Sequence, residues 1–239
     1  MKSLVNAAAR RTKQGSRALI AGLRRAEPER LAFLAVGESV AWSRLFQWDR
    51  ADKGLSRAVT PVLALSLARL PKTRSTGYLA GALAAGSVGQ WVKTRGLARP
   101  SALGVAGVSG HYAGYGFALW HAGARPTPTM AAVGGAAVLG GTLAAAAKSP
   151  AHVPAVLIGG ACAALNAALA DDPSFRENNA PVQAQGLSHG ANLLMVSEAA
   201  TFARALTTPG TWGFRGLGAA EAAAHYLGSF LLFEGLARR

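Results

Sequence analysis

The sequence predicts an all-α protein, a polytopic transmembrane bundle of about eight helices, and three observations carry this prediction. Of the 239 residues, 51% are hydrophobic and only 15% are charged, whereas soluble domains carry about 25% charged residues. The charges crowd into the first 30 residues and into the gaps between apolar stretches. Those stretches are about 17 to 24 residues long, which is the length that a helix needs to cross a bilayer.

A basic N-terminal tail, residues 1–30, precedes a transmembrane helical domain that we expect over residues 31–237. The tail mixes basic with apolar residues, so it is either a helix lying on an anionic leaflet or a disordered cytoplasmic extension. It has no apolar core of the kind found in signal peptides, and we expect no cleavage. Its basic residues are Lys2, Arg10, Arg11, Lys13, Arg17, Arg24, Arg25 and Arg30.

Eight apolar segments follow the tail. We expect spans at about residues 31–47, 55–70, 77–92, 102–120, 130–147, 153–170, 183–206 and 218–236. The second ends at Pro71, and Lys93 and Arg95 close the third. Two prolines, Pro126 and Pro128, separate the fourth from the fifth. Proline and clustered charge both interrupt apolar helices, so these residues mark the span ends.

The fifth and sixth segments consist mostly of Ala, Gly, Val and Leu, and the seventh, after an acidic loop at residues 171–181, is unusually polar. Small residues let helix backbones approach closely in lipid, which predicts a compact bundle rather than a pore. The glycines expected at such contacts are Gly81, Gly86, Gly89, Gly134, Gly135, Gly140 and Gly141.

An even number of spans places both termini on one side of the membrane. The basic tail and the basic loop at residues 69–74 lie on that side, and basic loops favour the cytoplasm. The Ala-, Gly- and Arg-rich composition is typical of a GC-rich bacterium. We therefore expect a protein of the bacterial inner membrane with both termini cytoplasmic.

The net charge of +14 raises the alternative of nucleic-acid binding. That function needs a basic stripe with aromatic or polar readers on a folded surface, whereas the charge here flanks apolar spans, where it attracts anionic headgroups. The expected partners are thus bilayer lipids and no nucleic acid. The single cysteine, Cys162, excludes an internal disulfide and reads as a small buried hydrophobe.

Ionisable residues inside a span are costly and are candidates for function. Arg44, Glu221 and Glu234 lie near span ends, where we expect their side chains to reach the interface. Glu38 and Glu198 lie deeper, and an isolated carboxyl at Glu198 would hold its proton or be paired, with His111 or Tyr226 as possible structural partners. A carboxyl that keeps its proton suits general-acid chemistry.

His111 is followed by Tyr115 on the same helix face, which favours a polar cleft in the fourth segment. A histidine between helices is also a common structural hydrogen-bonding group, as His189 and His225 are expected to be. No metal-binding motif and no phosphate-binding loop is present, so the sequence predicts no metal and no cofactor.

Five segments, in order, resemble the lysoplasmalogenase-like (YhhN-type) family of membrane proteins over about residues 31–237. Gly86-Ser87-Val88-Gly89-Gln90-Trp91 is similar to that family's S-x-x-G-D helix, and Gly107-Val108-Ser109-Gly110-His111 with Gly123-Ala124-Arg125-Pro126 to its G-x-x-x-F-x-x-x-H helix. Gly190-Ala191-Asn192-Leu193-Leu194-Met195-Val196-Ser197-Glu198 resembles its G-A-x-x-F-x-x-S-D helix. Val59-Thr60-Pro61 stands where the family has T-K-P. Ala224-His225-Tyr226-Leu227-Gly228-Ser229-Phe230-Leu231-Leu232 resembles the family's terminal Y-x-x-A-Q-x-L helix.

The resemblance implies an eight-helix enzyme that hydrolyses the vinyl ether bond of lysoplasmalogens to an aldehyde and a glycerophospho-alcohol. It implies Glu198, Gln90 and His111 as catalytic residues, with Glu38 as a possible replacement carboxyl. We also expect substrate-binding roles for Tyr115, Ser197, Asn192 and Tyr226. The sequence differs from the family pattern at Gln90 and Thr60, which replace an aspartate and a lysine, and Glu198 is one methylene longer than the family's aspartate.

A second function remains open at this point. A non-catalytic lipid-binding or structural membrane protein could keep the same scaffold, and the neutral Gln90 favours that alternative. The Ser197-Glu198 pair and His111 favour the hydrolase. A transporter ranks third, because paired broken helices and internal repeats are not evident.

Overall fold

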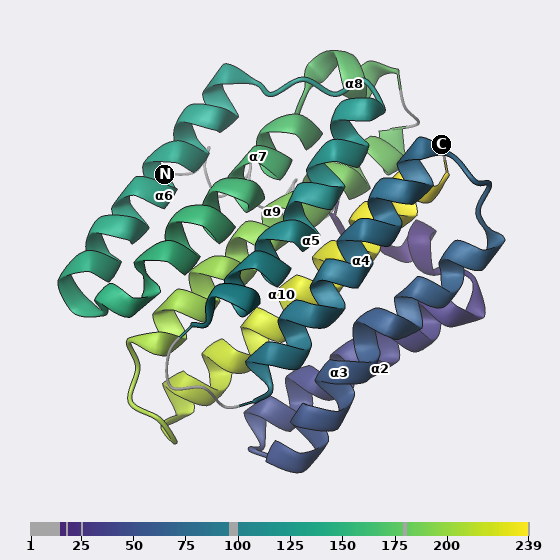
Figure 1. The fold of residues 1–239 in the computed structure, drawn as a ribbon. Helices are drawn as coiled ribbons and strands as arrows, with labels where there is room; N and C mark the ends of the chain where they lie inside the picture. The colour runs from purple at the N-terminus through teal and green to yellow at the C-terminus, as the bar shows by residue number, and fades with distance from the viewer. Residues whose placement is uncertain (1–14, 18, 25, 96–99, 179–180, 239) are drawn as a thin grey trace.

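The computed structural model describes residues 15–17, 19–24, 26–95, 100–178 and 181–238. Within these ranges the chain is helical with no strand (Figure 1), which confirms the all-α prediction. The longer helices are α2 (Pro28–Leu45), α3 (Asp49–Leu65), α4 (Arg74–Lys93), α5 (Ala102–His121), α6 (Pro128–Lys148), α7 (Gly160–Ala170), α9 (Pro181–Ala205) and α10 (Trp212–Ala237). The shorter elements are the 3-10 turns Ser66–Arg69 and Pro150–His152, the π-helical turn Ala155–Gly159 and α8 (Pro173–Glu177).

Each of the eight apolar segments expected from the sequence corresponds to one of the long helices. Their starts are set by local chemistry: the side chains of Thr73, Ser101 and Thr211 accept backbone N–H groups at the N-termini of α4, α5 and α10. The second helix starts earlier than expected, at Asp49, because acidic residues in a first turn are stabilised by the helix dipole.

Two helical stretches, Pro128–Lys148 and Pro150–Ala170, are long and apolar enough to cross a membrane by length and composition. The other long helices among the described residues carry more polar side chains. Many of these, such as Ser109, His111 and Glu221, are buried inside the bundle.

Seven helical segments pack side by side in a closed ring, in the order α2, α3, α4, α5, α7, α9 and α10, with α10 returning to α2. Helix α6 lies outside this ring against α7, at the left edge of Figure 1. Only Gly134 and Ala145 of α6 are buried. The core fills the ring, so the arrangement is a packed bundle, and its largest fully buried side chains include Tyr112, Tyr115, Phe33, Phe230 and Phe233.

Glycines bring two helix pairs unusually close. A Cβ at Gly107 of α5 would lie 2.6 Å from the backbone nitrogen of Gly89 on α4, and a Cβ at Gly190 of α9 would lie 2.8 Å from the carbonyl oxygen of Gly228 on α10. Small residues permit this backbone contact. Of the glycines expected at contacts, Gly86, Gly89, Gly134 and Gly141 are in close contact across helices, and Gly81, Gly135 and Gly140 face open space.

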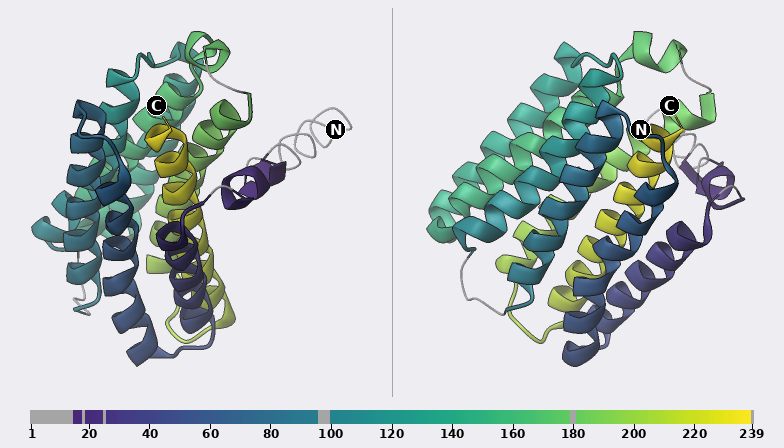
Figure 2. Two further views of the ribbon diagram at one scale, coloured as in Figure 1. Left: turned by 90° about the vertical axis from the view of Figure 1, so that its right-hand side faces the viewer. Right: turned by 45° about the vertical axis from the view of Figure 1, so that its right-hand side comes forward.

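The N-terminal part of the chain is helical where it is described, at residues 15–17 and 19–24; its first 14 residues lie outside the described ranges. Figure 2 shows this purple segment beside the bundle rather than within it. A Cβ at Gly22 would lie 3.2 Å from the ring of Phe230 on α10, so the segment touches the bundle. Arg30, expected in the tail, is buried in α2 and paired with Glu234 at the end of α10.

The acidic loop after α7 is anchored by Asp172. Its carboxylate accepts the backbone N–H of Arg125 at 2.7 Å, and the backbone N–H and hydroxyl of Ser174 at 3.0 and 2.8 Å. Burial opposes ionisation of this carboxyl, but the hydrogen bonds outweigh burial and hold the pKa of Asp172 below its usual value. Asp172 thus links the loop before α6 to the start of α8.

We expect Gly107→Ala to lower the free energy of unfolding by about 1–3 kcal/mol, because the added methyl group meets the α4 backbone. Gly81→Ala is the matched control, since a Cβ there meets nothing within 4 Å and alanine favours a helix by roughly 1 kcal/mol. Denaturant titration in detergent measures both. Equal stability of the two variants would contradict the packing of α4 on α5.

The lowered pKa of Asp172 predicts a pH-dependent contribution to stability. The contribution is fully present above the unfolded pKa of about 3.9 and is lost as the pH falls through the lower pKa of the folded state. We therefore expect Asp172→Asn to lower the melting temperature at pH 6 and to lower it less at pH 3. A difference between wild type and variant that does not change with pH would argue against this role.

Candidate active site

A cavity of about 510 Å³ opens at the end of the ring where α4 ends and α5 begins. Its walls come from the ends of six helices and from the π-helical turn before α7. Four cationic side chains line it, Arg44, Lys53, Lys93 and Arg204. Three carboxyls line it as well, Asp52, Glu198 and Glu221.

Glu221 of α10 is the centre of an ion network inside the cavity. Its carboxylate oxygens lie 3.1 Å from Arg44 on α2, 3.5 Å from Lys93 on α4 and 3.5 Å from Arg204 on α9. The Glu221 side chain is only 8% exposed. A buried carboxylate is stable as an anion only when opposite charges surround it, and these three cations provide them. Arg44 also donates to Asp52 at 3.0 Å. With Asp52, the network joins five helices of the ring, α2, α3, α4, α9 and α10.

The expectation that Arg44, Glu221 and Glu234 reach the interface is therefore wrong. Arg44 and Glu221 are buried and paired with each other, and Glu234 is buried between Arg30 and Arg238. Opposite charges on neighbouring helices meet inside the bundle, which stabilises the buried charges better than isolated burial would.

Glu198 lies one residue beyond Ser197, whose hydroxyl donates to the backbone carbonyl of Glu221 at 3.1 Å. The Tyr112 hydroxyl of α5 donates to Oε1 of Glu198 at 2.6 Å. Nδ1 of His225 on α10 lies 3.4 Å from the same hydroxyl. Because the tyrosine proton is committed to Glu198, His225 can donate its Nδ1 proton to the tyrosine oxygen. The three side chains form a chain of hydrogen bonds that ends at a carboxyl lining the cavity.

The backbone opposite Glu198 is irregular. Residues Ala155–Gly159 form a π-helical turn, directly after Pro154, and π-helical turns occur often at functional sites. A Cβ at Gly159 would lie 3.3 Å from Oε2 of Glu198. The glycine therefore leaves room at the carboxyl oxygen that Tyr112 does not hold.

His111 lies behind this group, buried in the core. Its Nδ1 lies 2.8 Å from the carbonyl oxygen of Ala82, which can only accept, so Nδ1 carries the proton. In the neutral ring, Nε2 then accepts from the Ser229 hydroxyl at 3.2 Å. The ring centres of His111 and His225 are 5.3 Å apart. His111 supports His225 by packing and does not line the cavity.

The other expected catalytic residues lie apart from Glu198. Glu38 is exposed on α2 and accepts from Nε1 of Trp42 at 3.3 Å. Gln90 is buried in α4, outside the cavity wall, and its Oε1 has no donor among the described residues. Residues Phe33, Gly37 and Val40 mark the buried face of α2, and Glu38 falls outside that stripe.

The expected substrate-binding residues do not line the cavity. The Tyr115 hydroxyl donates to the carbonyl of Ser229 at 3.4 Å, and the Asn192 side chain donates to the carbonyl of Ser188 at 2.8 Å. Tyr226 packs edge-on against Phe33 of α2, with ring centres 5.9 Å apart. Ser197 reaches the α10 backbone, as described above.

Sequence reasoning did not place Tyr112 or the three cations in the site, and it treated His225 as structural. Helical spacing contains part of the missing signal, because Glu221, His225 and Ser229 repeat every four residues along one face of α10. The cations give no such signal, because their helices meet only in the fold. Within the described ranges no group of three or more metal-ligating side chains is close enough to hold a metal ion.

Comparison with known proteins gives no match to any family model, to any curated protein or to any solved structure.

The ion network predicts a clear effect of removing the carboxylate that three of its cations share. We expect Glu221→Gln to lower the free energy of unfolding by about 3 kcal/mol, because it leaves the buried Arg44 with Asp52 alone to balance its charge and takes the carboxylate partner from Lys93 and Arg204. Glu38→Gln, which alters an exposed carboxyl on α2, should change stability little. Thermal unfolding in detergent compares them. If Glu221→Gln has the same melting temperature as the wild type, the network does not stabilise the bundle.

Proposed function

We propose that this chain is a membrane-embedded lipid hydrolase whose eight helical segments, Pro28–Leu45 to Trp212–Ala237, all cross the bilayer. Their lengths of 17 to 26 residues, with Pro150–Ala170 as one helical stretch, correspond to roughly 26–39 Å at about 1.5 Å per residue. A bilayer core is about 30 Å thick. The start of α2 and the end of α10 then lie at the end opposite the cavity, and the basic loop at residues 69–74 favours this end as the cytoplasmic side of a bacterial inner membrane.

The outer surface supports this membrane assignment. Val133, Leu139 and Leu143 of α6 are 58–63% exposed, and large apolar side chains on most other helices also face outward. Soluble proteins rarely expose so much apolar surface. Lipid chains are the solvent that suits it.

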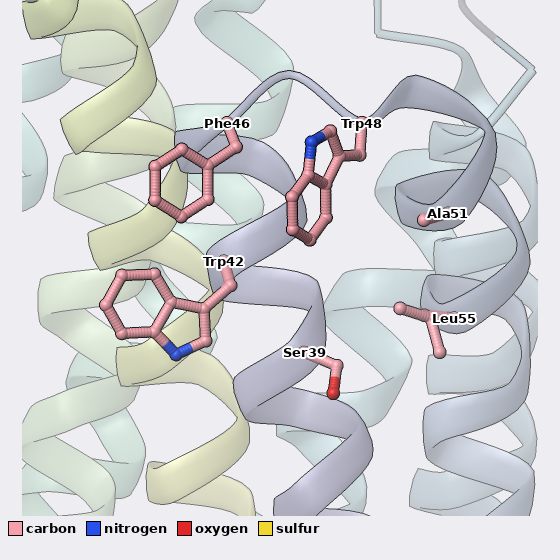
Figure 3. Close-up of a pocket in the computed structure, with 6 residues that line it drawn as sticks. All are labelled: Ser39, Trp42, Phe46, Trp48, Ala51 and Leu55. Carbon is pink, nitrogen blue, oxygen red and sulfur yellow. The ribbon is translucent and has the colours of Figure 1, made fainter.

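Aromatic residues gather at the cavity end of the bundle. Figure 3 shows Trp42 and Phe46 at the end of α2 and Trp48 in the turn to α3, facing Leu55 across a shallow groove. Trp42 stacks on Phe46 and Phe46 on Trp48, with ring centres 5.7 and 5.4 Å apart. Trp212, at the same end, is 69% exposed. Tryptophan is enriched at membrane–water interfaces, so these rings support an interface at this level.

The observation that carries the catalytic proposal is the Glu198 carboxyl, which is held by Tyr112 and lines the same cavity as the four cationic side chains. In the reaction the Glu198 proton is transferred to the vinyl carbon remote from the ether oxygen, and the double-bond electrons form the new C–H bond. Water then attacks the resulting oxocarbenium carbon and returns a proton to Glu198. The hemiacetal breaks its C–O bond to give an aldehyde and an alcohol. General-acid catalysis of this kind contributes about 10²–10⁴-fold.

The choice of a vinyl ether substrate rests on the resemblance of five segments to lysoplasmalogenase-like proteins. Three of those segments supply Glu198, His111 and His225, which the fold brings together. Gln90 lies outside the cavity and has no part in the proposed reaction. The alternative is a non-catalytic lipid-binding or structural membrane protein. The other two carboxyls that line the cavity favour it, because Glu221 contacts three cations and Asp52 accepts from Arg44 and Ser56.

We expect detergent-purified protein to release fatty aldehyde from a 1-alkenyl lysophospholipid and not from the saturated 1-alkyl ether, which cannot be protonated at carbon in this way. Glu198→Gln should lower turnover about 10²-fold or more, because the amide cannot donate the proton. Glu177→Gln, an exposed carboxyl on α8 at the other end of the bundle, is the matched control and should keep full turnover.

Tyr112→Phe separates positioning from folding in the same assay. The ring still fills the core, but the hydrogen bond to Glu198 is lost, so the pH profile of turnover should shift while KM changes little. Full activity of Glu198→Gln would remove Glu198 from the reaction. Lipid binding by the wild type without any aldehyde would support the alternative function.

A further inference from the structure

We infer that the outer part of the cavity, lined by Lys93, Arg204 and the N-terminus of α5, binds the phosphate group of a lipid headgroup while the rest of the lipid extends to Glu198. This inference rests on the proposed function only for the position of the reacting bond. The phosphate site itself follows from charge and burial.

The cations in the cavity outnumber the carboxylates available to them. Glu221 is shared by Arg44, Lys93 and Arg204, and Asp52 accepts from Arg44 and from Ser56. These two carboxylates are thus already bound, and Tyr112 rather than a cation holds the third lining carboxyl, Glu198. Lys93 and Arg204 have side chains 33% and 27% exposed, so they can contact both Glu221 and a ligand in the cavity. A surplus of positive charge beside saturated carboxylates favours an anionic ligand over an ammonium group.

The start of α5 adds a second anion-binding feature. Ser101 and Gly104 line the cavity, and the Ser101 side chain caps the helix by accepting the N–H of Gly104 at 3.1 Å. This helix is 20 residues long, and its N-terminus carries a partial positive charge. Backbone N–H groups at such an N-terminus bind phosphate readily.

An unpaired hydroxyl lies about two helical turns further along α5, in the wall of the same cavity. Ser109 lines the cavity and is only 7% exposed, yet its Oγ has no hydrogen-bond partner among the described residues. Buried hydroxyls are normally paired. A phosphate oxygen or a glycerol hydroxyl of the bound lipid would provide the partner.

Lys93 and Arg204 are linked to Glu198 through few contacts. Ser197, next to Glu198, donates to the backbone of Glu221, whose carboxylate contacts Lys93 and Arg204. Few bonds can therefore separate the bound phosphate from the reacting bond. A glycerol-based lysolipid meets that requirement, because three carbons link its phosphate to its ether oxygen.

The test measures binding by calorimetry in neutral detergent with two lipids that cannot be hydrolysed by this route. These are a 1-alkyl-glycerophospholipid and the 1-alkylglycerol that lacks only the phosphate headgroup. We expect the phosphorylated lipid to bind at least about tenfold more tightly, which corresponds to one or more charge-assisted hydrogen bonds. Inorganic phosphate, tested alone, should bind far more weakly than the lipid.

Three variants assign the difference to this cavity. Arg204→Gln should weaken binding of the phosphorylated lipid about tenfold, and Ser109→Ala, which leaves the ion network intact, should weaken it several-fold. Arg215→Gln is the matched control, because Arg215 lies at the same end of α10, over Trp212 and outside the cavity. It should bind as the wild type does.

Equal affinity for the two ether lipids would overturn the inference, as would wild-type binding by both Arg204→Gln and Ser109→Ala. Inorganic phosphate binding as tightly as the lipid would also overturn it, because the site would then take free phosphate. If the phosphate-dependent binding is found but no aldehyde is ever released, the inference stands and the proposed hydrolysis fails.

Discussion

One buried carboxylate shared by three cations is the interaction on which this structure depends. Glu221 of α10 holds Arg44, Lys93 and Arg204, and so ties the ends of α2, α4 and α9 around one cavity. Buried charge is tolerated only when it is paired, so the network fixes how these helix ends meet. The same network leaves Glu198 as the lining carboxyl that is held by a phenol and bonded to no cation in the described part of the chain.

Apolar side chains lie both inside and outside the bundle. The core contains Phe33, Phe230 and Phe233 together with buried polar groups such as His111 and Glu221, whereas leucines and valines of α6 face outward. A chain surrounded by water rarely exposes so much apolar surface. The proposed membrane setting and the polar site are linked, because a hydrocarbon solvent accepts the apolar exterior and makes buried charges costly unless they are paired or functional.

Much of the fold could be predicted from the sequence, because apolar runs end at charges and prolines that also end the helices. The boundaries of α2 and α3 differ from the expected ones by a few residues. Pro28 favours the start of α2, and the helix dipole stabilises Asp49 and Asp52 in the first turn of α3; hydropathy records neither effect. Glu198 was selected as a candidate by its apolar neighbours and by the resemblance of its segment to a family motif, and the fold places it at the cavity. The role of Glu221 was missed because its position near the start of the expected apolar segment suggested exposure. Only the meeting of four helices reveals its partners. Glu38 was overvalued because depth along a helix does not say which face a residue occupies; the stripe through Phe33, Gly37 and Val40 contains that information.

The central claim is that lipid, not water, surrounds the long helices. Alkaline carbonate extraction of membranes from cells that express the protein tests it most directly, since high pH removes proteins held by charge and leaves those that cross the bilayer. The account predicts that the chain stays in the membrane pellet at pH 11 and is released by a mild detergent. Recovery of folded protein in the carbonate supernatant would contradict it.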